Sequence, residues 1–131
     1  MSLGFHSAIG FEVDLEGTGN GRCRVHGKIE QKHLNINHVV HGGVYATVLD
    51  TAMGGAVVTT LHPDEVTATT SLYVEFIRSA RLGQVLTCIG TVTRRGHHVA
   101  FCDGQITDEK GTLMGSARGT WYIWETNQKK G

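Results

Sequence analysis

Hydrophobic and polar residues alternate along most of the chain, and the alternating stretches are rich in β-branched and aromatic residues. This pattern is typical of strands that bury one face. Turn residues separate the stretches, for example GTGNG after the first and EKG before the last. Six strands are predicted in this way, the first two as a hairpin, at residues 10–17, 22–29, 66–79, 84–96, 97–108 and 112–124.

One segment, between a polar loop and the only proline, Pro63, follows a different pattern. Apolar residues recur there at helical spacing, which predicts a helix from Gly42 or Gly43 to about Leu61. A broad arc of this helix is apolar and consists of Val44, Tyr45, Val48, Leu49, Ala52, Met53 and Ala56. The narrow remaining arc carries no Lys, Arg or Glu, although the outer face of a surface helix normally does.

The predicted elements follow the order β-β-α-β-β-β-β, which indicates an α+β fold with one long antiparallel sheet and one helix on its face. A length of 131 residues suits a single domain, with a core at about residues 9–125. Because the outer face of the helix carries no Lys, Arg or Glu, we expect a second copy of the chain to cover this face. The protein is therefore predicted to be a homodimer at least.

Composition narrows the classes of function. The 12 basic and 12 acidic residues balance, which argues against a general nucleic-acid binder. The three cysteines are far apart and form no C-x-x-C pair, so we expect reduced thiols and a cytoplasmic protein without a signal peptide. The apolar segment holds Asp50, four Gly and four Thr, which argues against a membrane helix. The histidine spacings predict no metal site.

Asp50 is the single formal charge between Lys32 and Asp64. Burying an isolated carboxylate is costly, so its retention indicates either a catalytic role or a structural hydrogen bond. Just before the helix, the sequence HGG at residues 41–43 offers either a flexible helix start or a ligand site. The first N–H groups of a helix lack internal partners and carry partial positive charge, which suits an oxyanion.

Gly42 and Asp50 lie almost on the same edge of the predicted helix, roughly 12 Å apart by helical rise. This separation is too large for both to act on one carbonyl group within a single chain. Across a two-fold axis, the helix start of one subunit can meet the carboxylate of the other. The predicted active site is therefore shared between subunits.

The combination of Asn35, HGG at residues 41–43 and Asp50 resembles the PaaI-type thioesterases of the hotdog superfamily. The resemblance extends over nearly the whole chain and includes FIRSARLG after the third strand and TRRGHH in the next hairpin. It implies a curved antiparallel sheet around one helix, with two chains pairing into a continuous sheet and a dimer of dimers as the expected assembly. The sequence itself leaves dimer versus tetramer open. The implied activity is hydrolysis of acyl-CoA thioesters, without a cofactor other than the CoA of the substrate.

The resemblance also implies roles for individual residues. Asp50 activates a water molecule or attacks directly, and the Gly42 N–H polarises the thioester carbonyl from the other subunit. Asn35 assists there, and His41 hydrogen-bonds near the thioester. A hydroxyl residue early in the third strand holds the water, and the best match by offset is Thr69. The neighbouring hydroxyl residues that compete for this role are Thr67, Thr70 and Ser71.

A second set of residues is predicted to contact substrate. Gly43 lets a ligand approach the backbone, and Tyr45 either lines the acyl pocket or packs in the core. Arg94, Arg95 and His97 form a basic hairpin, which is either a solvated turn or a contact for the CoA phosphates.

Two residues depart from the family pattern: Ser79 stands where Pro is frequent, and His38 stands where Gly is frequent. Two other classes of function remain open, a hotdog dehydratase or hydratase and a non-catalytic acyl-CoA binding protein. Asp50 after HGG fits both less well than it fits a thioesterase. The sequence does not distinguish a general base from a nucleophile at Asp50. It identifies neither the acyl chain nor whether the thioester is one of CoA or of an acyl-carrier protein.

Overall fold

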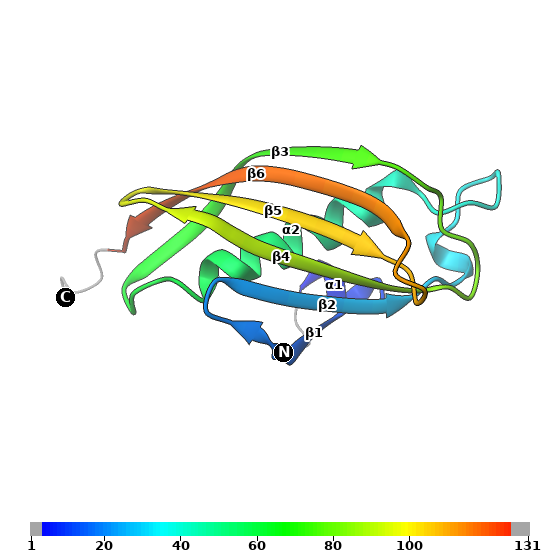
Figure 1. Cartoon of the computed structure of the whole chain (residues 1–131), viewed down its shortest axis with the longest axis horizontal. Coiled ribbons are helices and arrows are strands. Elements are labelled where there is room, and N and C mark those ends of the chain that lie inside the picture. The colour runs from blue at the N-terminus through cyan, green and yellow to red at the C-terminus, as the bar shows by residue number, and fades with distance from the viewer. Residues whose placement is uncertain (1–3, 127–131) are drawn as a thin grey trace.

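A curved antiparallel sheet wraps around one long helix in the computed structural model, which describes residues 4–126 (Figure 1). Residues 1–3 and 127–131 of the predicted domain lie outside the described residues. The predicted order of elements is confirmed, with a short helix α1 and a 3₁₀ turn at Gln31–His33 as additions. The elements are α1 (Phe5–Ala8), β1 (Glu12–Gly19), β2 (Arg22–Lys28), α2 (Gly42–Val58), β3 (Glu65–Phe76), β4 (Val85–Arg95), β5 (Val99–Thr107) and β6 (Leu113–Glu125).

The strand order in the sheet is β1-β2-β4-β5-β6-β3, and every neighbouring pair is antiparallel. The chain leaves β2, forms α2 beneath the sheet and returns at the far edge as β3 (Figure 1). Within the described chain, β3 pairs with β6 on one side only. Its other side presents unpaired backbone groups, which can pair with another strand.

The apolar arc of α2 faces the sheet as predicted. All seven residues of the predicted arc are buried, and Val57 joins them. The helix ends at Val58, three residues before the predicted end at Leu61. The hydroxyl groups of Thr59 and Thr60 donate to the carbonyl oxygens of Ala56 and Val57, at 2.7 and 2.6 Å. These bonds satisfy carbonyl groups that a longer helix would have used, and they end the helix before the proline.

Glycines in the sheet let α2 approach the strands closely. A Cβ atom on Gly90 of β4 would collide with the carbonyl oxygen of Ala52, and one on Gly104 of β5 would lie 2.7 Å from the sulfur of Met53. Gly90 therefore excludes any side chain while the helix holds its place, and a side chain at Gly104 would require the Met53 side chain to move. No helix within residues 4–126 has the length and apolar content to cross a membrane.

The three cysteines, Cys23, Cys88 and Cys102, carry free thiols that are buried between the sheet and α2 or within the sheet. Burial raises the pKa of all three thiols, that of Cys102 to about 12. These thiols are therefore protonated at neutral pH and behave as small apolar side chains.

Candidate functional site

The middle of α2 carries Asp50 toward the edge strand β3, where its carboxylate meets a hydroxyl group. The Oγ1 of Thr69 donates a hydrogen bond to Oδ1 of Asp50 at 2.7 Å. The competing hydroxyl residues point elsewhere, since Thr67 donates to the carbonyl oxygen of Tyr122 and Ser71 bonds the hydroxyl of Thr120. Among the hydroxyl residues at the start of β3, Thr69 is thus the one bonded to the carboxylate.

A β-bulge gives Thr69 this orientation. The pairing of β3 with β6 shifts register between Thr69 and Ser71, so that Thr70 has no partner on β6. A bulge of this kind turns a side chain locally and increases the twist of the strand. Thr69 is opposite the buried Trp121 and faces the helix side of the sheet, whereas Ser71 is opposite Thr120 and faces the outside.

The first turn of α2 begins with HGG as predicted, and His41 caps it. The Nδ1 atom of His41 accepts a hydrogen bond from the Gly43 amide at 2.9 Å, and its carbonyl oxygen accepts one from the Val44 amide at 2.9 Å. The Gly42 amide has no acceptor among residues 4–126, and Gly42 is exposed. Because Nδ1 of His41 accepts, the neutral ring carries its proton on Nε2, which remains available as a donor.

The loop before the helix holds Asn35 in a tight turn. Its side-chain oxygen accepts hydrogen bonds from the amides of Asn37 and Val39, at 2.8 and 3.4 Å. The Nδ2 group of Asn35 is therefore the part of this side chain left to donate to a ligand. The turn needs a left-handed residue at His38, which has φ 63°. This explains why the resembling family favours Gly at this position, because Gly adopts positive φ without strain.

A cleft of about 270 Å³ brings several predicted residues together beside the helix start. Tyr45 is fully buried next to it, stacks on the ring of Phe76 at 6.1 Å between centroids, and donates through its hydroxyl to the Arg78 carbonyl oxygen at 2.7 Å. Burial raises the pKa of Tyr45 to about 12, so it stays a neutral donor. Tyr45 thus both packs and borders the cleft. The lining consists of Asn35, Val39, Val40, Gly42, Tyr45, Phe76, Ile77, Arg78 and Ser79.

Phe76 and Arg78 are among the cleft residues that sequence reasoning missed. Both belong to FIRSARLG, which the sequence analysis used for the resemblance without assigning roles to single residues. Their signal is the position at the end of a long strand, at the same end of the sheet as the helix start. Phe76 lies directly against Gly42, because a Cβ atom on Gly42 would be 3.3 Å from its ring.

Asp50 is not part of this cleft. Eight residues of helix separate it from Gly42, which is roughly 12 Å of rise. Both groups nevertheless border the same edge strand, Asp50 through Thr69 and the cleft through Phe76 at the end of β3. A single chain therefore holds the carboxylate and the unpaired amide in two separate clusters along β3.

The basic hairpin between β4 and β5 does not form one cationic cluster. Arg94 is registered with the exposed Phe101 and Arg95 with the buried Ala100, so the two side chains leave opposite faces of the sheet. Arg95 binds Oε1 of Glu65 at 2.6 Å and Oγ1 of Thr60 at 3.2 Å.

His97 at the tip of the hairpin is exposed and packs edge-on against the ring of His98, at 5.0 Å between centroids. The guanidinium of Arg95 already has structural partners, while Arg94 and His97 remain available to a ligand. Contact of this hairpin with CoA phosphates stays a prediction.

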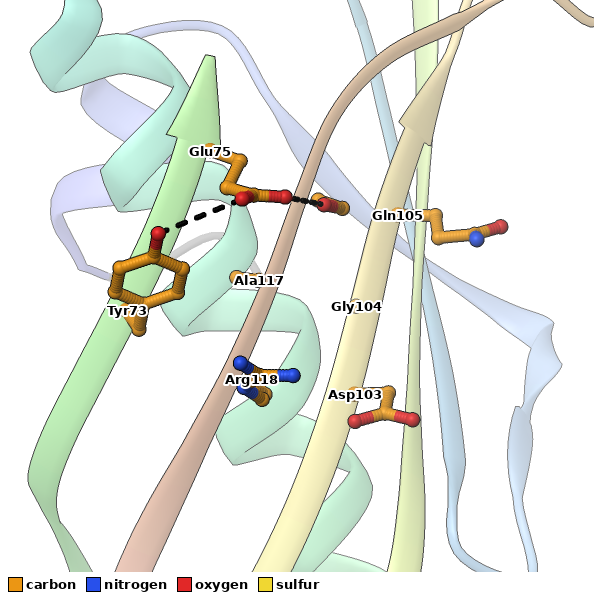
Figure 2. A pocket seen from close by; sticks show the side chains of 8 residues that line it. Tyr73, Glu75, Asp103, Gly104, Gln105, Ala117 and Arg118 are labelled. Carbon is orange, nitrogen blue, oxygen red and sulfur yellow. Dashed lines mark hydrogen bonds between the residues drawn. The ribbon is translucent and has the colours of Figure 1, made fainter. Parts of the chain in front are cut away.

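A further hollow, of about 260 Å³, lies on the outer face of the sheet, with α2 behind it (Figure 2). Tyr73, Glu75, Asp103 and Arg118 surround it, and the Arg118 guanidinium lies 5.6 Å from the centre of the Tyr73 ring. None of the residues predicted for the site lines this hollow. It is therefore separate from Asp50 and from the cleft at the helix start.

Residues 37–114 match the model of the thioesterase superfamily, and this range includes HGG, Asp50 and Thr69. The chain belongs to the thioesterase superfamily. The thioester hydrolase class predicted from the sequence is thereby confirmed. A curated relative, human acyl-coenzyme A thioesterase 13, is 23% identical over 120 residues, which cover 91% of this chain and 84% of the relative.

Solved structures confirm the hotdog fold. A point mutant of the phenylacetic acid degradation protein PaaI from Thermus thermophilus superposes with a TM-score of 0.81 at 20% identity, covering 89% of this chain and 96% of that one. A hypothetical thioesterase from Streptococcus pneumoniae, solved with coenzyme A, superposes with a TM-score of 0.80 at 23% identity, covering 88% and 87%.

The contact between Glu65 and Arg95 predicts a pH dependence of stability. The hydrogen bond from the His62 amide, together with the Arg95 guanidinium, holds the pKa of Glu65 below its usual value of 4.5. A lowered folded-state pKa stabilises the protein above the unfolded pKa, and this contribution disappears as pH falls through the folded value. We expect Glu65→Gln to lower the melting temperature at pH 6–7, and we expect this difference to shrink progressively as pH falls below 4.5.

Melting temperatures measured by calorimetry between pH 3 and 7 check this expectation. Glu16→Gln is the matched control, because Glu16 is exposed and its side chain makes no hydrogen bond or ion pair within residues 4–126. A Glu65→Gln difference that persists unchanged down to pH 3 would contradict the role given to the carboxylate charge.

Proposed function

We propose that the protein hydrolyses acyl-CoA thioesters to the free acid and CoA. The observation that carries this proposal is the hydrogen bond of Asp50 to Thr69, which orients an otherwise isolated carboxylate on α2. The similarity to an acyl-coenzyme A thioesterase and to a thioesterase solved with coenzyme A supports CoA as the thiol part of the substrate.

Asp50 is the group that starts the reaction in this proposal. Thr69 occupies Oδ1, and Oδ2 has no hydrogen-bond donor among residues 4–126. As a general base, Oδ2 takes a proton from water while the oxygen of that water attacks the thioester carbonyl. The C–S bond then breaks, and the thiolate of CoA takes a proton. As a nucleophile, the same oxygen attacks the carbonyl carbon, the C–S bond breaks and CoA leaves as the thiolate, and water then hydrolyses the resulting anhydride. Both routes remain open.

The developing oxyanion needs donors that are not already used. The Gly42 amide meets this condition, and the Nδ2 group of Asn35 and the protonated Nε2 of His41 are the nearby side-chain donors. Donors held in place before the reaction stabilise the charge that develops in the transition state. The apolar lining of the cleft at Tyr45 and Phe76 suits the acyl chain.

The carboxylate and these donors meet in the proposal through pairing of two β3 strands. Thr70 is the extra residue of the bulge and has no partner on β6. When Thr70 is left out of the count, Thr69 and Phe76 are each three positions from Tyr73 along β3. Antiparallel pairing about a two-fold axis near Tyr73 then places Thr69 opposite the partner's Phe76. Because Phe76 touches Gly42, Asp50 of one chain approaches the donors of the other, and the homodimer contains two shared sites.

Asp50→Asn should retain the fold and lose turnover by roughly 10²–10⁴-fold, the usual contribution of a general base. Asn preserves the size of the side chain and an acceptor for Thr69 but cannot take the proton. Release of CoA from a panel of acyl-CoA thioesters, followed with a thiol-reactive dye, provides the measurement. Asp64→Asn is the matched control, because Asp64 is exposed in the loop after α2. Hydrolysis by Asp50→Asn within about threefold of wild type would reject Asp50 as the group that activates water or attacks the thioester.

Sharing of the site is tested by mixing two inactive variants. One carries Asp50→Asn, and the other carries Asn35→Ala with Gly42→Pro, which removes the oxyanion N–H. Proline suits the first position of a helix, and the preceding His41 has the extended conformation, φ −70° and ψ 136°, that proline requires. A Cβ atom at Gly42 needs Phe76 to move by a few tenths of an ångström.

Each variant alone should be almost inactive. When the two are unfolded and refolded together, half of the dimers are mixed by random pairing, and one of the two sites in each mixed dimer is intact. Activity should therefore recover to roughly a quarter of wild type. Native mass spectrometry verifies that mixed dimers form. No recovery in a sample that contains them would mean that each site is built within one chain.

The phosphate groups of CoA have two candidate contacts. Arg94 was predicted from the sequence, and Arg78 borders the cleft itself. Because Arg94 is registered with the exposed Phe101 on the outer face, we expect Arg78→Ala to raise KM for CoA esters several-fold, and Arg94→Ala to do so less. The effect should shrink at high salt, since both residues are exposed.

The control substrate is a short thioester of the same acyl group without the nucleotide. An equal rise in KM for this compound would assign Arg78 to the acyl part of the substrate. A KM unchanged by either substitution at low salt would leave both arginines without a substrate role.

A further inference from the structure

When Tyr45 and the cysteines are counted with the hydrophobic core, His33 is the one buried polar or charged residue among residues 4–126, with 2% of its surface exposed. It ends the 3₁₀ turn just before the loop that presents Asn35 and the helix start. The proposed reaction does not use it, and it does not line the cleft. Because this buried imidazole takes no part in the proposed chemistry, we expect it to hold other groups in place.

Both ring nitrogens of His33 are used. Nδ1 accepts a hydrogen bond from the Glu30 amide at 2.8 Å, and Nε2 lies 2.5 Å from the carbonyl oxygen of Ile9. A carbonyl oxygen only accepts, so Nε2 carries the proton, and the neutral tautomer is the one that satisfies both partners. The ring also meets the buried Phe11 edge-on, at 5.6 Å between centroids. His33 therefore ties the turn to the N-terminal segment.

The backbone of His33 continues this connection to the helix start. Its carbonyl oxygen accepts a hydrogen bond from the His41 amide at 2.8 Å. His41 in turn accepts from the Gly43 amide, so the bonds run from Ile9 through His33 and His41 to the first turn of α2. The Gly42 amide is left unpaired at the end of this series.

The same residue sets the base of the Asn35 loop. Leu34, which follows His33, pairs with Val40 in an isolated β-bridge, and Val40 donates to the Ala80 carbonyl oxygen at 3.2 Å. The loop from Leu34 to Val40 is thus closed at its base by short contacts, and the ring of His33 anchors that base to the core. Loops carry functional groups accurately only when a rigid base holds them.

We propose that His33 is a positioning residue that fixes the Gly42 amide and the Asn35 side chain for the oxyanion. It acts through hydrogen bonds to Ile9 and Glu30 and through its carbonyl bond to His41, and it does not touch substrate. Its catalytic consequence rests on the proposed thioesterase function, whereas its effect on the helix start does not. Loss of the ring bonds lets the loop base move, which misdirects donors that act only in the transition state.

The test replaces His33 with Leu, Asn and Gln. Leu fills similar apolar space without polar atoms, Asn keeps an acceptor near the position of Nδ1, and Gln can keep the donor to Ile9. His26→Leu is the matched control, because His26 is exposed on β2 and makes no side-chain hydrogen bond within residues 4–126. Circular dichroism and thermal melts establish which variants fold.

The first measurement is kinetic. We expect His33→Leu to lower kcat at least tenfold with little change in KM, since donors that act in the transition state affect both kcat and kcat/KM. The Asn and Gln variants should recover part of kcat, and His26→Leu should match wild type. A folded His33→Leu protein with wild-type kcat would overturn the proposal, as would Asn and Gln variants no better than Leu when all three fold.

The second measurement does not depend on activity. Hydrogen exchange by NMR should show faster exchange at the His41 and Gly43 amides in every folded His33 variant, while amides in the β4–β5 ladder keep their wild-type rates. Unchanged exchange at these two amides overturns the proposal even if the protein has no thioesterase activity. If the Leu variant fails to fold, the Asn and Gln variants decide by the same two measurements. Faster exchange at these amides in the His33 variants, together with no thioesterase activity in the wild-type protein, would support the positioning role of His33. The same result would reject the proposed function.

Discussion

The close contact of α2 with the middle of the sheet is the constraint on which the rest of the structure depends. At Gly90 the sheet approaches the helix so closely that a Cβ atom would collide with the Ala52 carbonyl oxygen. This approach lets the sheet bury a helix that consists largely of small and apolar residues. Two residues before Ala52 on the same helix, Asp50 meets Thr69 of β3 at 2.7 Å.

The edge strand β3 connects the two halves of the candidate site. Its bulge aims Thr69 at the carboxylate, and its last residue, Phe76, closes the cleft over Gly42. One chain keeps these halves apart because a straight helix separates Asp50 from Gly42 by roughly 12 Å. The unpaired edge of the same strand is where a second chain can bring them together. The packing of α2 against the sheet and the proposed need for a dimer thus both depend on α2 and β3.

Backbone conformation and backbone hydrogen bonds hold the candidate site in place as much as side chains do. His41 uses its ring to take the Gly43 amide, which leaves the Gly42 amide unpaired, and His38 adopts positive φ to close the Asn35 turn. His33 secures the base of this loop from within the core. In the hairpin between β4 and β5, by contrast, the backbone keeps two side chains apart. Adjacent residues of a strand face opposite sides of the sheet, so Arg94 and Arg95 do not converge on one ligand.

The sequence alone determined the order of the elements, the buried arc of α2, and the isolation of Asp50 behind HGG. These features follow from local periodicity and from the cost of burying charge, and both can be read along the chain. The end of α2 was placed three residues too late, because the hydroxyls of Thr59 and Thr60 end the helix through bonds to their own neighbours. Only the tertiary structure decided which of four hydroxyl residues meets Asp50, that Arg95 binds Glu65, and that His33 is buried with both ring nitrogens bonded. Each of these depends on a contact between separate segments, or on a bulge that changes side-chain direction by one residue. Periodicity assigns a residue to a face of its own element, but the partner on another element follows only from how the elements pack.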